Sequence, residues 1–252
     1  MADAAALSDD AFLGGALRLL QPRRGYRAGS DAVLLAAAVP AQGTQRVLDA
    51  GAGVGAVALT LAHRLPEIRI DALELQPPLA ALAAENARRN GFAGRLAIIT
   101  GDLACPPAAL AHDYDHVVSN PPYHEPGSSH ASPQRSRDLA RRESHLGLGA
   151  WIGACLARLR PGGTLTLIQR AGRQEEVLAV LAPAAGGAVV LPLLPGPGRP
   201  AKRLIVRAVK GAGAPPAWAP GLVLHRADGA YTGAAEAVLR HGAALDFAPA
   251  ET

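Results

Sequence analysis

The stretch Val47-Leu48-Asp49-Ala50-Gly51-Ala52-Gly53-Val54-Gly55 decides the fold of this chain. An apolar run that closes on an acid is typical of a buried strand, and the alternating glycines let the backbone turn sharply and approach a ligand closely. A helical stretch follows at 57–64, and a second apolar run at 68–75 contains Glu74 near its end. A strand, a glycine turn, a helix and a strand-end acid about 20 residues later are typical of a nucleoside-binding unit, in which the acid can bind both ribose hydroxyls.

The glycines follow the spacing Gly-x-Gly-x-Gly, whereas dinucleotide sites use Gly-x-Gly-x-x-Gly. Because Asp49 precedes the turn, the sequence favours a positively charged ligand over a pyrophosphate. The structural alternative is a plain strand-to-helix turn in which Asp49 forms a salt bridge.

On both sides of this unit, short runs rich in β-branched residues or leucine alternate with alanine-rich stretches of helical length. This alternation is typical of an α/β protein whose mostly parallel sheet is covered by helices on both faces. The predicted strands cover 46–50, 68–75, 96–100, 116–119, 164–169, 188–194 and 203–209, and the predicted helices cover 30–38, 57–64, 78–90, 146–159, 174–182 and 234–241.

Four residues follow or close predicted strands: Gly51, Glu74, Asp102 and Asn120. In a parallel sheet the ligand site lies beyond the carboxyl ends of the strands, near the point where the strand order reverses. We therefore expect these four residues to gather along one edge of the sheet.

The motif Asn120-Pro121-Pro122-Tyr123 comes directly after the predicted strand at 116–119. Proline has no N–H, so the backbone at this motif mainly accepts hydrogen bonds. Such a pocket suits a planar group that donates N–H bonds, such as an exocyclic amine or a primary amide. The structural alternative is that Asn120 caps the strand, the prolines end it and Tyr123 lies in the core.

Length and composition bound the remaining possibilities. The chain has 252 residues, is 49% hydrophobic and has no apolar run long enough for a membrane span, so we expect one soluble domain. Its acidic N-terminus does not resemble an export signal, and Cys105 and Cys155 fit neither a disulfide framework nor a cysteine-based zinc site. We expect a cytoplasmic protein without a metal, organised as an N-terminal segment with a short helix (1–44), a catalytic domain (45–210) and a C-terminal tail (211–252) that lies on the surface.

The net charge of +4 is concentrated in two basic clusters that contain no acid. The first cluster comprises Arg18, Arg23, Arg24 and Arg27, and the second comprises Arg199, Lys202, Arg203, Arg207 and Lys210. Each cluster is either a surface that faces phosphates or ordinary solvated charge, because a basic patch indicates a polyanion without specifying it. The same two alternatives hold for Arg135.

These motifs resemble those of a known family. The sequences LDAGAGVG (48–55), ALELQ (72–76) and GDL (101–103) are similar to the cofactor motifs of class I S-adenosylmethionine-dependent methyltransferases, and SNPPY (119–123) is similar to the catalytic motif of their amino-methylating branch. GYRAGSDAVLLAA (25–37) and SPQR (132–135) further resemble the bacterial tRNA(Val) adenine-N6 methyltransferases. The resemblance implies a Rossmann-like fold with a mostly parallel, seven-stranded sheet.

The resemblance also implies roles for individual residues. Those at the cofactor S-adenosylmethionine would be Ser30, Asp31, Asp49, Gly51, Gly53, Glu74, Asp102 and Asn120. Asn120, Pro121 and Tyr123 would be catalytic, and Pro122, Tyr123 and Arg135 would contact the substrate. Ser30 or Asp31 alternatively serves only as the N-cap of the helix at 30–38.

The leading hypothesis is methylation of N6 of an adenosine in tRNA. A protein glutamine-N5 methyltransferase that acts on release factors is the nearest alternative, since an amide presents the same N–H donors to the motif. An rRNA guanine-N2 methyltransferase and a cofactor-binding protein without catalysis remain open as well.

Overall fold

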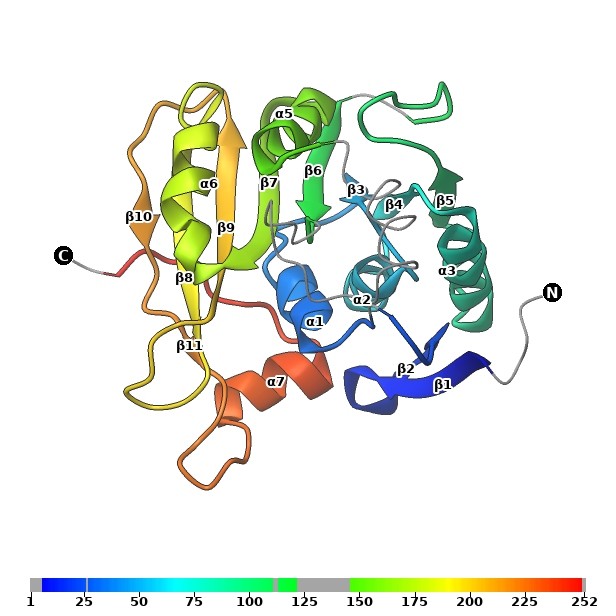
Figure 1. Cartoon of the computed structure of the whole chain (residues 1–252), viewed down its shortest axis with the longest axis horizontal. Coiled ribbons are helices and arrows are strands. Elements are labelled where there is room, and N and C mark those ends of the chain that lie inside the picture. The colour runs from blue at the N-terminus through cyan, green and yellow to red at the C-terminus, as the bar shows by residue number, and fades with distance from the viewer. Residues whose placement is uncertain (1–5, 26, 111–112, 122–145, 251–252) are drawn as a thin grey trace, which may run out of the picture.

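The computed structural model describes residues 6–25, 27–110, 113–121 and 146–250. These residues form one large twisted sheet with helices against both faces, together with a separate two-stranded hairpin near the N-terminus (Figure 1). Pro122, Tyr123 and Arg135 lie outside the described residues.

Nine strands of the described part make up the main sheet, in the order β10-β8-β9-β7-β6-β3-β4-β5, with β11 also paired to β8. The five adjacent strands from β7 to β5 run parallel, and β9 runs antiparallel between β7 and β8. Their bounds are β3 Arg46–Ala50, β4 Arg69–Glu74, β5 Leu96–Thr100, β6 Tyr114–Ser119, β7 Leu159–Arg170, β8 Ala185–Leu194, β9 Arg203–Lys210, β10 Ala217–Trp218 and β11 Leu222–Val223. The chain places β4 and β5 on one side of β3 and then β6 on the other, so the strand order reverses at β3.

The seven predicted strands are confirmed as β3 to β9, and the mostly parallel Rossmann-like sheet is confirmed with them. The sheet in the described residues has nine strands where the sequence predicts seven, because β10 and β11 extend it. Each of these two strands has only two residues, which is too short for an alternating pattern to be visible in the sequence.

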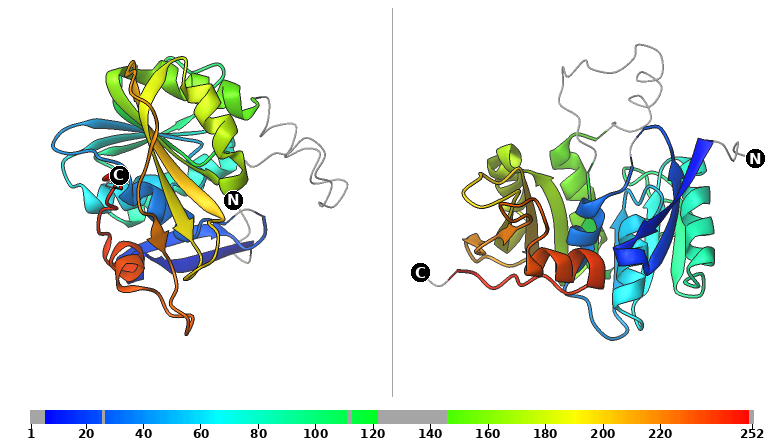
Figure 2. Two further views of the ribbon diagram at one scale, coloured as in Figure 1. Left: turned by 90° about the vertical axis from the view of Figure 1, so that its left-hand side faces the viewer. Right: turned by 90° about the horizontal axis from the view of Figure 1, so that it is seen from below.

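Helices cover both faces of the sheet (Figure 2). Their bounds are α1 Ser30–Ala37, α2 Ala56–Arg64, α3 Pro77–Arg89, α5 Leu148–Arg158, α6 Gln174–Leu181 and α7 Gly233–His241. Residues of α1, α2 and α7 share one buried apolar cluster, and residues of α5 and α6 share the other. Among the described residues, no helix has the length and apolar character needed to cross a membrane.

The central strands are buried on both faces, which explains why they are continuous apolar runs. Val47 and Val118 belong to the cluster below α1 and α2, whereas their neighbours Leu48 and Val117 belong to the cluster below α5. Each fully buried side chain of this size stabilises the fold by roughly 1.5–3 kcal/mol relative to exposure. The rigid centre of the sheet therefore supports the loops at its carboxyl edge.

The N-terminal hairpin is not predicted by the sequence pattern. It consists of β1 Leu7–Phe12, the short helix η2 Leu13–Gly15 and β2 Leu17–Pro22. Two asparagines of α3 hold β2: the Asn86 carboxamide bonds the N–H and carbonyl of Leu20, and Asn90 does the same for Arg18. These bonds satisfy an edge strand that would otherwise expose its backbone groups.

The start of α1 corrects the predicted cap. Gly29 occupies the N-cap position and no side chain caps the helix, whereas Ser30 is its first residue. The Asp31 carboxylate instead forms an ion pair with Arg203, at 2.7 Å. That ion pair connects α1 to the first residue of β9.

The C-terminal tail is more than a surface segment, which corrects the expectation from its prolines. Ala235, Val238 and Phe247 are buried in the cluster around α1, and the guanidinium of Arg207 lies over the Phe247 ring at 4.5 Å. Thr232 is the N-cap of α7, since its hydroxyl accepts from the Ala235 N–H.

Candidate functional site

The carboxyl edge of the sheet brings the four expected residues together. In the strand register Ala50 lies beside Leu73 on one side and beside Ser119 on the other. The next residue along each strand is therefore Gly51, Glu74 and Asn120, so these three share one row. Asp102 follows β5, the neighbour of β4, two residues beyond the partner of Glu74.

The turn after β3 depends on glycine. Gly51 has φ +79° and Gly53 has φ +58°, in the left-handed region that residues with a Cβ rarely adopt. A Cβ at Gly51 would also lie 3.1 Å from the Trp151 ring. The Gly51 and Ala52 N–H groups both donate to the Leu73 carbonyl at 2.9 Å, which fixes the turn to β4. The turn is thus held tightly against two neighbouring elements.

Glu74 joins the glycine turn from the end of β4. It is 6% exposed, and its carboxylate accepts from the Gly53 N–H at 2.7 Å and from the Gln76 N–H at 2.8 Å. The acid that the sequence places about 20 residues after the turn therefore contacts the turn directly.

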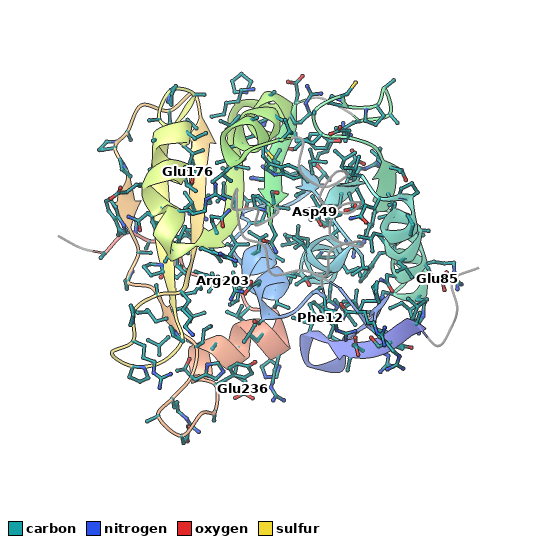
Figure 3. The ribbon with its side chains drawn as sticks, in the orientation of Figure 1. Phe12, Asp49, Glu85, Glu176, Arg203 and Glu236 are labelled. Atoms are coloured by element: carbon teal, nitrogen blue, oxygen red, sulfur yellow. The ribbon has the colours of Figure 1, made fainter. Side chains whose placement is uncertain are left out.

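Asp49 is the most deeply buried acid of this edge, at 1% exposure (Figure 3). Its carboxylate accepts from the N–H of Ala58, in the first turn of α2, at 3.1 Å. Burial raises the pKa of Asp49 to about 7; the Ala58 N–H opposes the shift and the nearby Glu74 charge adds to it. A positively charged group at this place would be strongly favoured, because it would compensate a buried carboxylate.

A hydrogen-bonded chain that the sequence analysis missed links β3, β6 and α5. The Trp151 indole N–H donates to the Ser119 hydroxyl at 2.9 Å, and that hydroxyl donates to the Ala50 carbonyl at 2.8 Å. The residues before Gly51 and before Asn120 are thereby tied together. The available signals were a serine directly before the Asn-Pro-Pro motif and a tryptophan in a helix whose other residues, apart from Arg158, are small or aliphatic.

Asn120 follows Ser119 directly at the end of β6. Its side chain is half-buried with a buried carboxamide oxygen, and Pro121 is buried. Only these two residues of the predicted Asn120–Tyr123 motif are described. The edge therefore presents an amide oxygen beside a buried proline, adjacent to the glycine turn.

Three further predicted site residues that the structure describes, Ser30, Asp31 and Asp102, have different contacts. Asp102 is half-buried, and its carboxylate accepts from the Ala104 N–H at 2.8 Å, which closes a local turn. Ser30 is exposed at the start of α1. Burial raises the pKa of Asp31, while its partner Arg203 opposes that shift; Figure 3 shows Arg203 beside α1.

The opposite edge of the sheet has a cavity of about 600 Å³ at the amino ends of β3, β4 and β5. Arg46, Arg69 and Asp71 are among its lining residues. It contains none of the predicted site residues, so it is separate from the carboxyl edge. The described residues include no group of three His, Cys, Asp or Glu side chains that could hold a metal ion.

The chain is similar to known methyltransferases. The family model of the methyltransferase small domain matches residues 27–179. A tRNA1(Val) (adenine(37)-N6)-methyltransferase from Aeromonas hydrophila is 34% identical over 212 residues, which cover 83% of this chain and 87% of that protein. An enzyme of the same name from Porphyromonas gingivalis is 36% identical over 158 residues, or 60% of this chain and 61% of that protein.

A solved structure supports the same fold. The crystal structure of a predicted O-methyltransferase from Agrobacterium tumefaciens has a TM-score of 0.71 and 26% identity, and the match covers 85% of this chain and 98% of that chain. The resemblance inferred from the sequence motifs is confirmed. The chain belongs to the methyltransferase small domain family and is an S-adenosylmethionine-dependent methyltransferase.

Proposed function

We propose that this enzyme transfers a methyl group from S-adenosylmethionine to N6 of an adenosine in tRNA. The observation that carries the proposal is the shared row of Gly51, Glu74 and Asn120, which sets a nucleoside-binding turn directly beside an amide oxygen. The relatives from Aeromonas hydrophila and Porphyromonas gingivalis, both named for methylation of adenine in tRNA1(Val), support the choice of substrate.

The residues of the turn would hold the cofactor. The buried Asp49 carboxylate suits the ammonium group of its methionine part, and Gly51 and Gly53 leave room for the ligand along the backbone. Glu74 would accept from the ribose hydroxyls and Asp102 from the adenine amine. Ser30 and Asp31 would lie at the methionine end. S-adenosylmethionine itself supplies a methyl group activated by a sulfonium.

The residues after β6 would orient the accepting nitrogen. The Asn120 side-chain oxygen and the Pro121 carbonyl would each accept one N–H of an amine, which turns its lone pair toward the methyl group. The transfer would break the carbon–sulfur bond of the cofactor and form a carbon–nitrogen bond, and the nitrogen would then lose a proton to water. Holding the reacting atoms in line supplies part of the rate acceleration, with an upper range of about 7–11 kcal/mol. Tyr123 would stack on the base, and Pro122 and Arg135 would contact the RNA around it.

Nucleoside mass spectrometry tests the proposal. Purified protein, methyl-labelled S-adenosylmethionine and an unmodified tRNA(Val) transcript should give N6-methyladenosine. Parallel reactions with unmodified rRNA and with a release factor test the guanine-N2 and glutamine-N5 alternatives. Label in guanosine, in a ribose hydroxyl or in protein, with none in adenosine, would overturn the assignment. Since the substrate is tRNA, we also propose that the enzyme acts in the cytoplasm.

A further inference from the structure

Most residues of the two basic clusters have structural partners. In the first cluster, Arg18 pairs with Asp9 and Arg27 with Asp10. In the second, Arg203 pairs with Asp31, Arg207 lies over Phe247, and Lys210 donates to the Leu159 carbonyl. These five cations connect elements of the fold, so the acid-free appearance of both clusters in the sequence is misleading.

Four cations of the same clusters remain: Arg23, Arg24, Arg199 and Lys202. All four are exposed, and none has an ion pair or a side-chain hydrogen bond within the part of the chain that the structure describes. Arg23 and Arg24 follow directly after β2, and Arg199 and Lys202 lie in the connection from β8 to β9. We call them the free cations.

Contacts of the neighbouring residues place the free cations around the carboxyl edge. Arg27 donates to the carbonyl of Pro22, the residue before Arg23, and the chain then enters α1. From α1, Asp31 reaches Arg203, the residue after Lys202. Arg203 pairs in the sheet with Arg170, the last residue of β7, which is the strand next to β6 and Asn120.

The free cations therefore flank the first turn of α1 from two sides. The hairpin and the β8–β9 connection approach this turn from different directions (Figures 1 and 2). No acid occurs in residues 11–30 or 195–210. Among the residues that the structure describes, the acids whose ion pairs reach this region are Asp10 and Asp31, and they are already paired with Arg27 and Arg203. The result is four unneutralised charges on the side of the molecule that carries the site.

We infer that Arg23, Arg24, Arg199 and Lys202 bind backbone phosphates of the substrate RNA and seat it over Asn120. The inference rests on the proposed function and adds which of the basic residues bind the RNA. Exposed cations without protein partners can contact phosphates directly, which releases the counterions condensed on the RNA, and this release favours binding. The paired cations contribute less free energy to RNA binding, because contact with a phosphate would first break an existing ion pair.

Binding of a 3′-labelled, unmodified tRNA(Val) transcript, followed by fluorescence anisotropy at several salt concentrations, tests the inference. The double variants are Arg23→Gln/Arg24→Gln and Arg199→Gln/Lys202→Gln. Each should weaken binding on the order of tenfold near 0.1 M salt and reduce the slope of log K against log salt by about 1–2. Methylation at saturating tRNA should stay within about twofold of wild type.

The control is Arg69→Gln/Arg88→Gln, which removes the same number of positive charges from exposed positions away from the carboxyl edge; Arg88, unlike the free cations, is paired with Glu85. It should leave the tRNA affinity and the salt slope nearly unchanged. Calorimetric binding of S-adenosylhomocysteine checks that every variant is folded. If wild type binds and methylates tRNA while both double variants match the control, the inference is wrong and the proposed function stands. If wild type neither binds nor methylates tRNA, the proposed function fails and the inference falls with it.

Discussion

Among single residues, Asp49 is expected to make the stability of the protein depend on pH. Its pKa is about 7 in the folded protein and ordinarily 3.8, so the folded state binds the extra proton between these values. The ligand-free protein should therefore lose stability as the pH rises from about 4 to about 7, by up to about 4 kcal/mol, because each pKa unit corresponds to about 1.4 kcal/mol.

The substitution Asp49→Asn should remove the pH-dependent contribution of this carboxyl group to stability. Urea unfolding of the ligand-free proteins between pH 4.5 and 8 should show a decline for wild type and a flatter profile, with higher stability near pH 8, for the variant. The affinity of the wild-type protein for S-adenosylmethionine should rise with pH up to about 7. The affinity of the variant should not depend on pH in this range. An equal decline in both proteins would contradict the assigned role of burial.

Gly51 and Gly53 provide a matched pair at the turn. Gly51→Ala meets two obstacles, a φ of +79° and the Trp151 ring at 3.1 Å, whereas Gly53→Ala meets only the positive φ, with nothing within 4 Å of its Cβ. Backbone strain alone costs roughly 1–2 kcal/mol. Denaturant unfolding should show a larger loss for Gly51→Ala than for Gly53→Ala. Equal losses of stability would mean that the Trp151 ring moves away from the added methyl group without destabilising the protein.

At the scale of elements, Asn86 joins the hairpin, α3 and the glycine turn. Its amide donates to the Leu20 and Val54 carbonyls, and its oxygen accepts from the Leu20 N–H. Asn86→Ala should destabilise the protein by about 2–4 kcal/mol, because buried backbone groups lose their partners. Asn90→Ala, which affects the exposed end of β2, should lose only about 1 kcal/mol in the same urea experiment. A reversed order would show that the hairpin depends on other contacts.

The elements differ in how well the sequence predicts them. Strands β3 to β9 and the main helices were predicted because a buried parallel sheet needs continuous apolar runs separated by helices. The hairpin was missed because Asp9, Asp10 and the adjacent Gly14 and Gly15 have the composition of a loop. Its stability comes from α3, through asparagines at helical spacing i, i+4, and such a tertiary contact is not visible in local propensity.

The candidate site, like the elements, could be predicted from the sequence only in part. The shared row of Gly51, Glu74 and Asn120 follows from strand ends and was predictable, whereas the link from Trp151 through Ser119 to Ala50 required the packing of α5 on the sheet. The partners of Arg18, Arg27 and Arg203 likewise come from β1 and α1, and the sequence could not assign them.

For the whole molecule, the two cysteines report on global unfolding. Cys105 is exposed, whereas Cys155 lies on the buried face of α5, and burial raises the pKa of its thiol well above the ordinary value. A thiol reagent should label Cys105 quickly in the native protein and Cys155 only as fast as the molecule opens. Mass spectrometry of a labelling series should give a Cys155 rate that rises with urea, while Cys105→Ser leaves that rate unchanged. Rapid native labelling of Cys155 would contradict the packing of α5.

At the scale of the whole molecule, one edge of the sheet brings together the glycine turn, which we propose binds the cofactor, and Asn120, which we propose orients the amine. The most direct test is methyl transfer to unmodified tRNA(Val) by wild type and by Asn120→Ala, with nucleoside mass spectrometry and calorimetric binding of S-adenosylhomocysteine on the same preparations. We predict N6-methyladenosine with wild type and a turnover lower by on the order of 10²-fold in the variant, with cofactor affinity unchanged. Unchanged turnover in Asn120→Ala, or wild type that forms no N6-methyladenosine, would contradict the account.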